Sequence, residues 1–291
     1  MRVTQSMLVN HFVQNLLGNQ RRMYELHRQA SSGVRLHQPS DDPLAVAQVM
    51  RFDSEAVDIR RFTDNARDAL DWLGATDASL QEFHDAVHRA REMVVRGASD
   101  SLSDEDRQAV AAEMDQLIDH LIQAANATYK GRYIFAGTET LTRPFERTAG
   151  TITYSGNDLA IERAVGVDAR VQVNVPGQPL LDVLNSLQAA YDDMVANNTA
   201  ALSTVHLSAL DTAVEALLAV RSQVGARANR VEWASARLGD VAFQVEKLGS
   251  ELRDADIARV LVDLRAVEVT LQATMASASR MFETSLVNFL R

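Results

Sequence analysis

The sequence predicts a mainly α protein: an elongated antiparallel helical rod with a small β-rich inserted domain. Glycine and proline are scarce, with 13 and 5 copies among 291 residues, and aromatic residues make up 5%. This composition favours long helices over compact mixed folds. Apolar residues recur every three or four positions over long segments in both halves of the chain, as in helices packed along a seam. Residues 131–179 instead alternate apolar and polar residues between turn dipeptides such as Gly156-Asn157, which indicates strands.

The first helix is expected to end near Ser32 and to be followed by a hinge. Gly33 can adopt the left-handed conformation that terminates a helix, and Pro39 favours extended geometry at the residue before it. Asp42 can cap a new helix that starts at Pro43, where the missing amide hydrogen of proline would be unpaired anyway. The predicted hinge residues are therefore Gly33, Pro39, Asp42 and Pro43. An apolar seam runs along the first helix through Val9, Phe12, Leu16, Asn19, Met23, Leu26 and Ala30.

The second helix is expected to continue from Pro43 to Gly97, because only Thr76 interrupts its apolar seam. That seam consists of Ile59, Phe62, Ala66, Ala69, Leu73, Thr76, Leu80, Phe83, Val87, Ala90 and Val94.

A third helix is expected from about Asp104 to Tyr129. Ser103 provides its cap, and the three acidic residues that follow favour the positive end of a helix dipole. The apolar positions of the expected strands in the insertion are Ile152, Tyr154, Val171, Val173 and Val175. A short helix and a second long apolar seam are expected after the insertion. Ten of the thirteen positions in this second seam are apolar: Leu207, Leu210, Val214, Leu217, Arg221, Val224, Ala228, Val231, Ser235, Leu238, Ala242, Val245 and Gly249.

The last segment carries an apolar stripe with a period of about 3.6 residues, which fits a nearly straight amphipathic helix. Such a helix gains too little alone to offset its ordering entropy. We therefore expect the rod seams to form core and the two chain ends to form an assembly surface. The predicted assembly interface comprises Val9, Phe12, Leu16, Met23, Leu26, Val260, Leu264, Leu271, Met275, Phe282, Leu286 and Phe289.

Charge and composition exclude several function classes. The net charge of −10 provides no basic footprint for nucleic acid. The chain has no cysteine, so disulfides, thiolate metal sites and cysteine nucleophiles are excluded. Neither a cleaved signal peptide nor an apolar run of membrane-spanning length is visible, so no membrane partner is expected.

One motif raises the question of a metal. His84 and His88 have the i, i+4 spacing of a zinc-metalloprotease helix, with Asp85 in place of the glutamate. No third ligand is evident, and Phe83 and Val87 place both histidines on the rim of the helical seam. We therefore expect solvated histidines, and no catalytic residue, metal site or cofactor.

Four separated stretches resemble the flagellin superfamily of bacterial flagellar axial proteins. They are SSGVRLHQPSDDPLAVA, RSQVGARANRVE at 221–232, DADIARVLVDLRAVEVTLQATMA at 254–276, and SLVNFLR at the end. Flagellins typically have Asp-Asp-Ala-Ala at the hinge, whereas this chain has Pro-Ser-Asp-Asp-Pro at 39–43. The stretch GRYIFAGTETLTRPF at 131–145 is likewise similar to the junction proteins between hook and filament.

The resemblance implies a structural subunit that polymerises at the hook-filament junction and adapts the hook to the filament. It implies export by the flagellar secretion system with a chaperone, an extracellular place in the flagellum, and termini that form a coiled coil on assembly. The implied partners are other copies of the chain, a companion hook-associated protein and flagellin. The expected divisions are 1–40 and 254–291 as assembly helices disordered in the monomer, 41–130 and 204–253 as rod helices, and 131–203 as the variable insertion.

Three alternatives stay open. A flagellin would extend long filaments where a junction protein would stop after a short layer. A metalloprotease would need bound zinc. A cytoplasmic coiled-coil scaffold would be fully folded alone.

Overall fold

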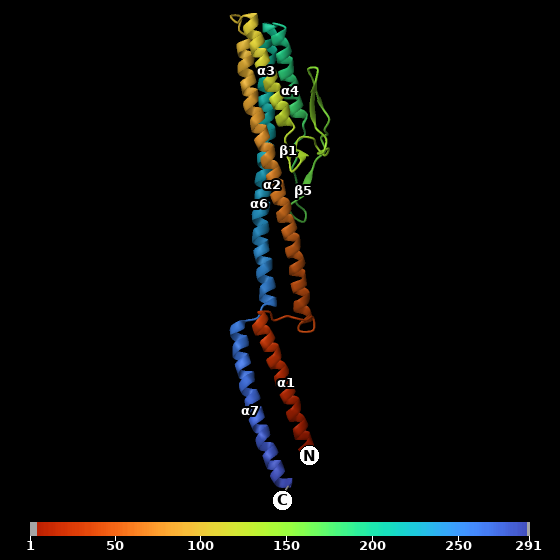
Figure 1. The fold of residues 1–291 in the computed structure, drawn as a ribbon, viewed down its shortest axis with the longest axis vertical. Helices are drawn as coiled ribbons and strands as arrows, with labels where there is room; N and C mark the ends of the chain where they lie inside the picture. The colour runs from red at the N-terminus through yellow and green to blue at the C-terminus, as the bar shows by residue number, and fades with distance from the viewer. Residues whose placement is uncertain (1–4, 290–291) are drawn as a thin grey trace. The chain divides into compact units, whose positions relative to one another are not determined.

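The computed structural model describes residues 5–289 of the backbone, and side chains at residue 7 and residues 10–279 (Figure 1). The chain divides into two units. Unit 1 contains the residues up to Val57 and those from Phe243, and unit 2 contains Asp58–Ala242, so both boundaries fall within long helices. The helices are α1 (Gln5–Ser32), α2 (Pro43–Gly97), α3 (Asp104–Ala125), α4 (Gln178–Val195), α5 (Thr199–Ala201), the π-helical turn η1 (Leu202–His206), α6 (Leu207–Arg253) and α7 (Ile257–Phe289). The predicted class, mainly α with a small β-rich insertion, is confirmed.

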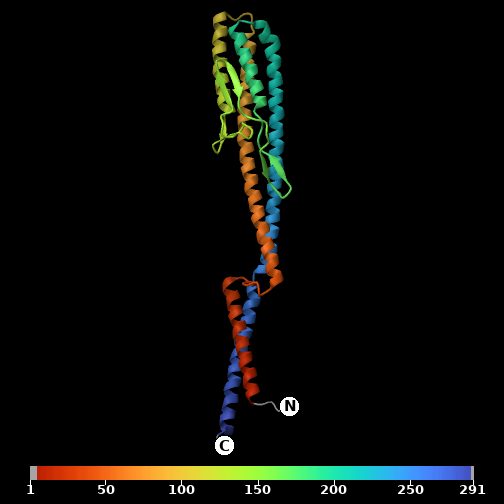
Figure 2. The same ribbon diagram turned by 90° about the vertical axis from the view of Figure 1, so that its right-hand side faces the viewer.

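The core of unit 2 lies between α2, α3, α4 and α6, which run side by side (Figures 1 and 2). Every residue of the predicted α2 seam is buried, including Thr76, whose hydroxyl donates to the carbonyl of Trp72 at 2.9 Å. This helical hydrogen bond explains how a polar residue is tolerated in the seam. The predicted α6 seam is also buried or half-buried throughout.

Helix α3 begins as predicted and ends earlier than predicted. Ser103 has extended geometry and its hydroxyl accepts from the amide of Asp106 at 3.1 Å. The helix stops at Ala125, not Tyr129, because Asn126 turns its side chain towards the insertion. Its amide group donates to the carbonyl of Phe145 at 2.9 Å and its oxygen accepts from the Phe145 amide at 3.0 Å. A contact distant in sequence therefore ends the helix.

The insertion contains three antiparallel hairpins. They are formed by β1 (Thr128–Tyr129) with β2 (Arg132–Tyr133), β3 (Phe145–Thr148) with β4 (Thr151–Tyr154), and β5 (Glu162–Ala164) with β6 (Arg170–Gln172). The first two turn at Lys130-Gly131 and Ala149-Gly150, pairs with two positive φ angles, as in the tight turns that match strand twist.

The expected strand positions in the insertion are partly corrected. Ile152, Tyr154 and Val171 lie in strands, whereas Val173 and Val175 are buried just beyond β6. Gly156-Asn157 is not a hairpin turn. The Asn157 side-chain oxygen instead accepts from the Thr138 amide at 2.9 Å and so ties two loops together.

One buried cation joins the helix connections of unit 2. Arg107 is 4% exposed. Its guanidinium donates to the carbonyls of Gly97, Ser99 and Leu102 and to the side-chain oxygen of Asn197. The loop between α2 and α3 and the turn after α4 are thus held by one side chain.

One helix corrects the expectation about membrane-spanning composition. Within Thr199–Arg253, an 18-residue stretch is long and apolar enough to cross a membrane, with a mean hydropathy of 1.2. This reflects runs rich in alanine, valine and leucine. The same helix contributes Leu210, Leu217, Val224 and Val231 to the core of unit 2, and 22% of the apolar stretch is buried.

Candidate functional site

The segment predicted as a hinge is the loop between α1 and α2, where its four predicted residues have different local roles. Gly33 has φ +72° and its amide donates to the carbonyl of Gln29 at 2.9 Å, which terminates α1. Pro43 is the first residue of α2. Asp42 caps that helix, accepting from the amide of Ala45 at 3.1 Å. Pro39 is exposed within the loop.

Asp41 also organises the hinge, and the sequence analysis did not identify it. One of its carboxylate oxygens accepts from the amides of both His37 and Gln38 at 3.0 Å, so it closes the loop backwards while Asp42 caps forwards. These amides, aided by the Arg28 guanidinium, hold the pKa of Asp41 below its usual value. Two adjacent aspartates before a proline could have indicated this division of roles.

The hinge is bonded to the second place where the chain changes direction, between α6 and α7. Val34 and Asp254 form an isolated antiparallel bridge. The Arg35 amide donates to the carbonyl of Arg253 at 2.7 Å, and the Arg35 guanidinium donates to the carbonyl of Leu252 at 2.8 Å. The breaks before α2 and before α7 therefore form one cross-linked junction.

Beyond this junction, α1 and α7 lie antiparallel in unit 1 (Figure 1). Their apolar stripes face each other. Leu26, Val260, Leu264 and Val267 are buried, and Met23 packs against them. Phe12, Leu16 and Leu271 are half-buried, whereas Met275 is 52% exposed. The side chains of Val9, Phe282, Leu286 and Phe289 lie outside the described set.

Most of the described residues predicted for an assembly interface thus contact each other within the chain. Among the predicted residues that are described, Met275 alone is exposed, and the other exposed apolar residues of the two helices are different ones. We call them the outer face: Val13, Leu17 and Tyr24 on α1, and Ile257, Leu261, Val262, Val269 and Met275 on α7, with exposures between 40% and 71%. A search for apolar residues off the main seam would have found all of them except Met275, which lies on it. Exposed apolar clusters of this kind mark interaction surfaces.

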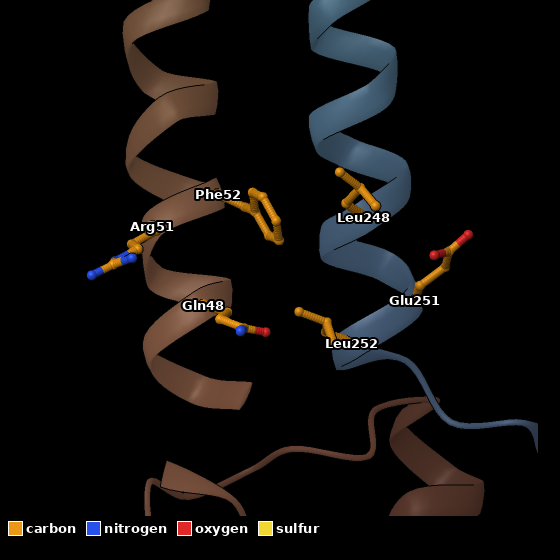
Figure 3. A pocket seen from close by; sticks show the side chains of 6 residues that line it. All are labelled: Gln48, Arg51, Phe52, Leu248, Glu251 and Leu252. Carbon is orange, nitrogen blue, oxygen red and sulfur yellow. The ribbon is translucent and has the colours of Figure 1, made fainter. Parts of the chain in front are cut away.

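Close to the junction, unit 1 has a groove between α2 and α6 (Figure 3). Its volume is about 430 Å³. Phe52 points towards Leu248, while Gln48 and Leu252 point towards each other and Arg51 points outwards. Opposite Phe52 stands Gly249, where a Cβ would lie 3.8 Å from the Phe52 Cβ, an ordinary van der Waals contact.

The histidine motif provides two imidazoles on α2. No group of three or more metal-ligating side chains was found within the part of the chain that the structure describes. His84 and His88 lie on the rim of the α2 seam as predicted, half-buried and exposed respectively.

Comparison with known proteins places these features in a family context. Residues 3–140 match the bacterial flagellin N-terminal helical region, and residues 207–290 match the bacterial flagellin C-terminal helical region. Together the two matches cover about three quarters of the chain and leave out most of the insertion.

Individual relatives align over nearly the whole chain. Flagellar hook-associated protein 3 of Escherichia coli is 26% identical, over 98% of each chain. Flagellin FlaB1 of Treponema pallidum is also 26% identical, over 98% of this chain and 100% of its own. The crystal structure of hook-associated protein 3 from Legionella pneumophila superposes with a TM-score of 0.64 at 17% identity, over 70% of this chain and 98% of that one. That last likeness shows the fold.

Proposed function

The chain belongs to the flagellin family, and from this premise we propose that it is a structural subunit of the bacterial flagellum at the junction between hook and filament. The observation that carries this proposal is the end-to-end alignment with a hook-associated protein 3, together with the fold shared with a second protein of that name. The chain has no enzymatic role in this proposal.

The α1–α7 pair supports assembly through the chain ends. Only four described residues are buried in this pair, and the outer face leaves eight large apolar side chains exposed. A two-helix pair with so small a core gains little against the entropy of ordering it. We therefore propose that residues 1–40 and 254–291 fold when copies of the chain meet, with the outer face covered by neighbouring copies.

The junction around Gly33 and Asp254 supports a hinge role. Since the bridge and the Arg35 bonds couple both breaks, the two terminal helices must change direction together. We propose that this coupling lets the terminal pair and the rod helices take different tilts in the polymer.

The resemblance to junction proteins suggests which other proteins the chain contacts. We propose a companion hook-associated protein on the hook side, flagellin on the filament side, and a dedicated chaperone before export to the cell exterior. The equal identity to a flagellin makes the filament subunit the alternative that a test must separate.

Deletion of the gene in the source bacterium tests the junction role. We expect cells that keep hooks, lack attached filaments and release flagellin into the medium. Purified chain added to filament seeds should stop after a short layer. Long filaments grown from this chain alone would overturn the junction assignment in favour of flagellin.

Variants of α7 test the outer face separately. Val262 and Val269 are seven residues apart, 69% and 64% exposed, and therefore on one side of the helix. Val262→Glu or Val269→Glu should abolish incorporation into flagella because a charge would be buried between copies. Gln272→Glu adds the same charge at an exposed polar position and is the control. Normal incorporation of both valine variants would show that this face stays in water.

A further inference from the structure

The pair of histidines on α2, His84 and His88, has no part in the proposed assembly role. His84 and His88 follow the i, i+4 spacing, and their Nε2 atoms are 3.2 Å apart. Two imidazole nitrogens bound to one metal ion at about 2.05 Å are separated by about 2.9 Å at a right angle and about 3.4 Å at a tetrahedral angle. The observed separation lies between these values.

We propose that His84 and His88 chelate one divalent transition-metal ion of the Ni²⁺, Cu²⁺ and Zn²⁺ class. In the unbound pair, one Nε2–H donates to the lone pair of the other Nε2. Metal binding takes both Nε2 lone pairs, so both rings then carry their proton on Nδ1, and the Nδ1 atom of His84 is buried without a hydrogen-bond partner among the described residues. Water completes the coordination sphere, and the site is therefore a surface binding site and not a closed catalytic centre.

The surroundings of the pair favour chelation in two ways. First, the helix is held rigidly, because the adjacent residues Phe83 and Val87 are fully buried. The backbone positions that carry the two rings are therefore fixed before any metal arrives, and only the rings must turn on binding.

Second, the charged neighbours are engaged elsewhere. The Asp85 carboxylate accepts from Gln81 at 2.8 Å, Arg89 pairs with Glu113, and Arg91 pairs with Asp211. The two rings also form an edge contact with centroids 4.5 Å apart, so both nitrogens already lie on one side of the helix.

Calorimetric titration of the intact, untagged and chelator-treated chain with NiCl₂ tests the site. We expect one Ni²⁺ per chain, no binding of Mg²⁺, and an affinity at least about tenfold weaker in His84→Gln and in His88→Gln. His120→Gln is the matched control, since His120 faces Glu82 at 3.1 Å and offers only one imidazole. Its affinity for Ni²⁺ should equal that of the unmodified chain.

Two results would overturn the proposal: no stoichiometric binding of Ni²⁺ to the unmodified chain, or an affinity for Ni²⁺ in both the His84 and the His88 variant equal to that of the unmodified chain. Circular dichroism verifies that the variants are folded. Gel filtration at the same Ni²⁺ concentration should show a monomer, and metal-dependent dimers would mean that the rings bind metal between chains.

Discussion

The amide of Ala255 donates a hydrogen bond of 2.9 Å to the carbonyl of Gly33. The two residues are 222 positions apart in the sequence, and the bond joins the break after α1 to the break between α6 and α7. Gly33 stands at φ +72°, a conformation that favours glycine, and no atom lies within 4 Å of where a Cβ would stand. The requirement for glycine is therefore conformational. The same backbone conformation orients the Gly33 carbonyl, which accepts the hydrogen bond from Ala255 between α6 and α7.

Gly33→Ala should weaken assembly without unfolding unit 2. A left-handed alanine costs about 1–2 kcal/mol, which lowers an assembly constant by about 5- to 30-fold. The measurement is incorporation of the variant into flagella, together with the melting temperature of the monomer, which should not change. Gly18→Ala, inside α1, is the matched control and should be neutral or stabilising, because alanine is the better helix former. Equal incorporation of both variants would refute a role for the Gly33 geometry.

Hydrogen exchange of the purified monomer should separate the chain ends from unit 2. Peptides from α1 and α7 should exchange within the shortest labelling time, because the pair alone has a core of four described residues. Peptides covering the seam of α2 and helix α3 should be protected. Slow exchange throughout would favour a self-contained helical scaffold and would remove the proposed folding on assembly.

The sequence predicted most of the helical framework because periodic burial is local information. The α2 seam and the breaks at Gly33 and Pro43 were found from spacing and capping residues alone. The end of α3 was not, since the pairing of Asn126 with Phe145 depends on a strand 19 residues away.

The candidate site was predictable to a smaller extent. Leu26 and Leu264 were predicted as assembly-interface residues, and in the structure they are buried against residues of the same chain, which only a three-dimensional structure shows. The outer residues such as Tyr24 and Val269 do not follow the main seam, and Arg35 bonds backbone carbonyls that carry no sequence signal.

Arg107→Met should be strongly destabilising for unit 2. It removes the donor that satisfies three backbone carbonyls in a buried place, and the loss is about 3 kcal/mol. For a unit of this size the melting temperature should fall by about 6–12 °C. Arg91→Met removes an exposed ion pair with Asp211 and should cost less than about 1 kcal/mol. A similar small loss in both variants would mean that water replaces Arg107 readily.

The contact between Asp193 and His206 should make unit 2 sensitive to acid. The two side chains are 2.6 Å apart, and hydrogen bonds from His206 and Asn198 hold the pKa of Asp193 below its usual value. A carboxyl group whose pKa is lowered by folding stabilises the native state above its unfolded pKa of about 3.9, and this contribution is lost as the pH falls through the folded value. Asp193→Asn should therefore lower the free energy of unfolding most at pH 6–7.

The decisive measurement is the difference in free energy of unfolding between Asp193→Asn and the unmodified chain as a function of pH. Urea unfolding of both proteins between about pH 7 and pH 2.5 should show curves that converge on acidification, because protonation removes from the unmodified chain the charge that asparagine lacks at every pH. Asp158→Asn, in the insertion, provides a control for the general effect of removing one negative charge. A difference between Asp193→Asn and the unmodified chain that stays constant down to pH 2.5 would show that the stabilisation comes from packing or neutral hydrogen bonding and not from the ionised carboxylate.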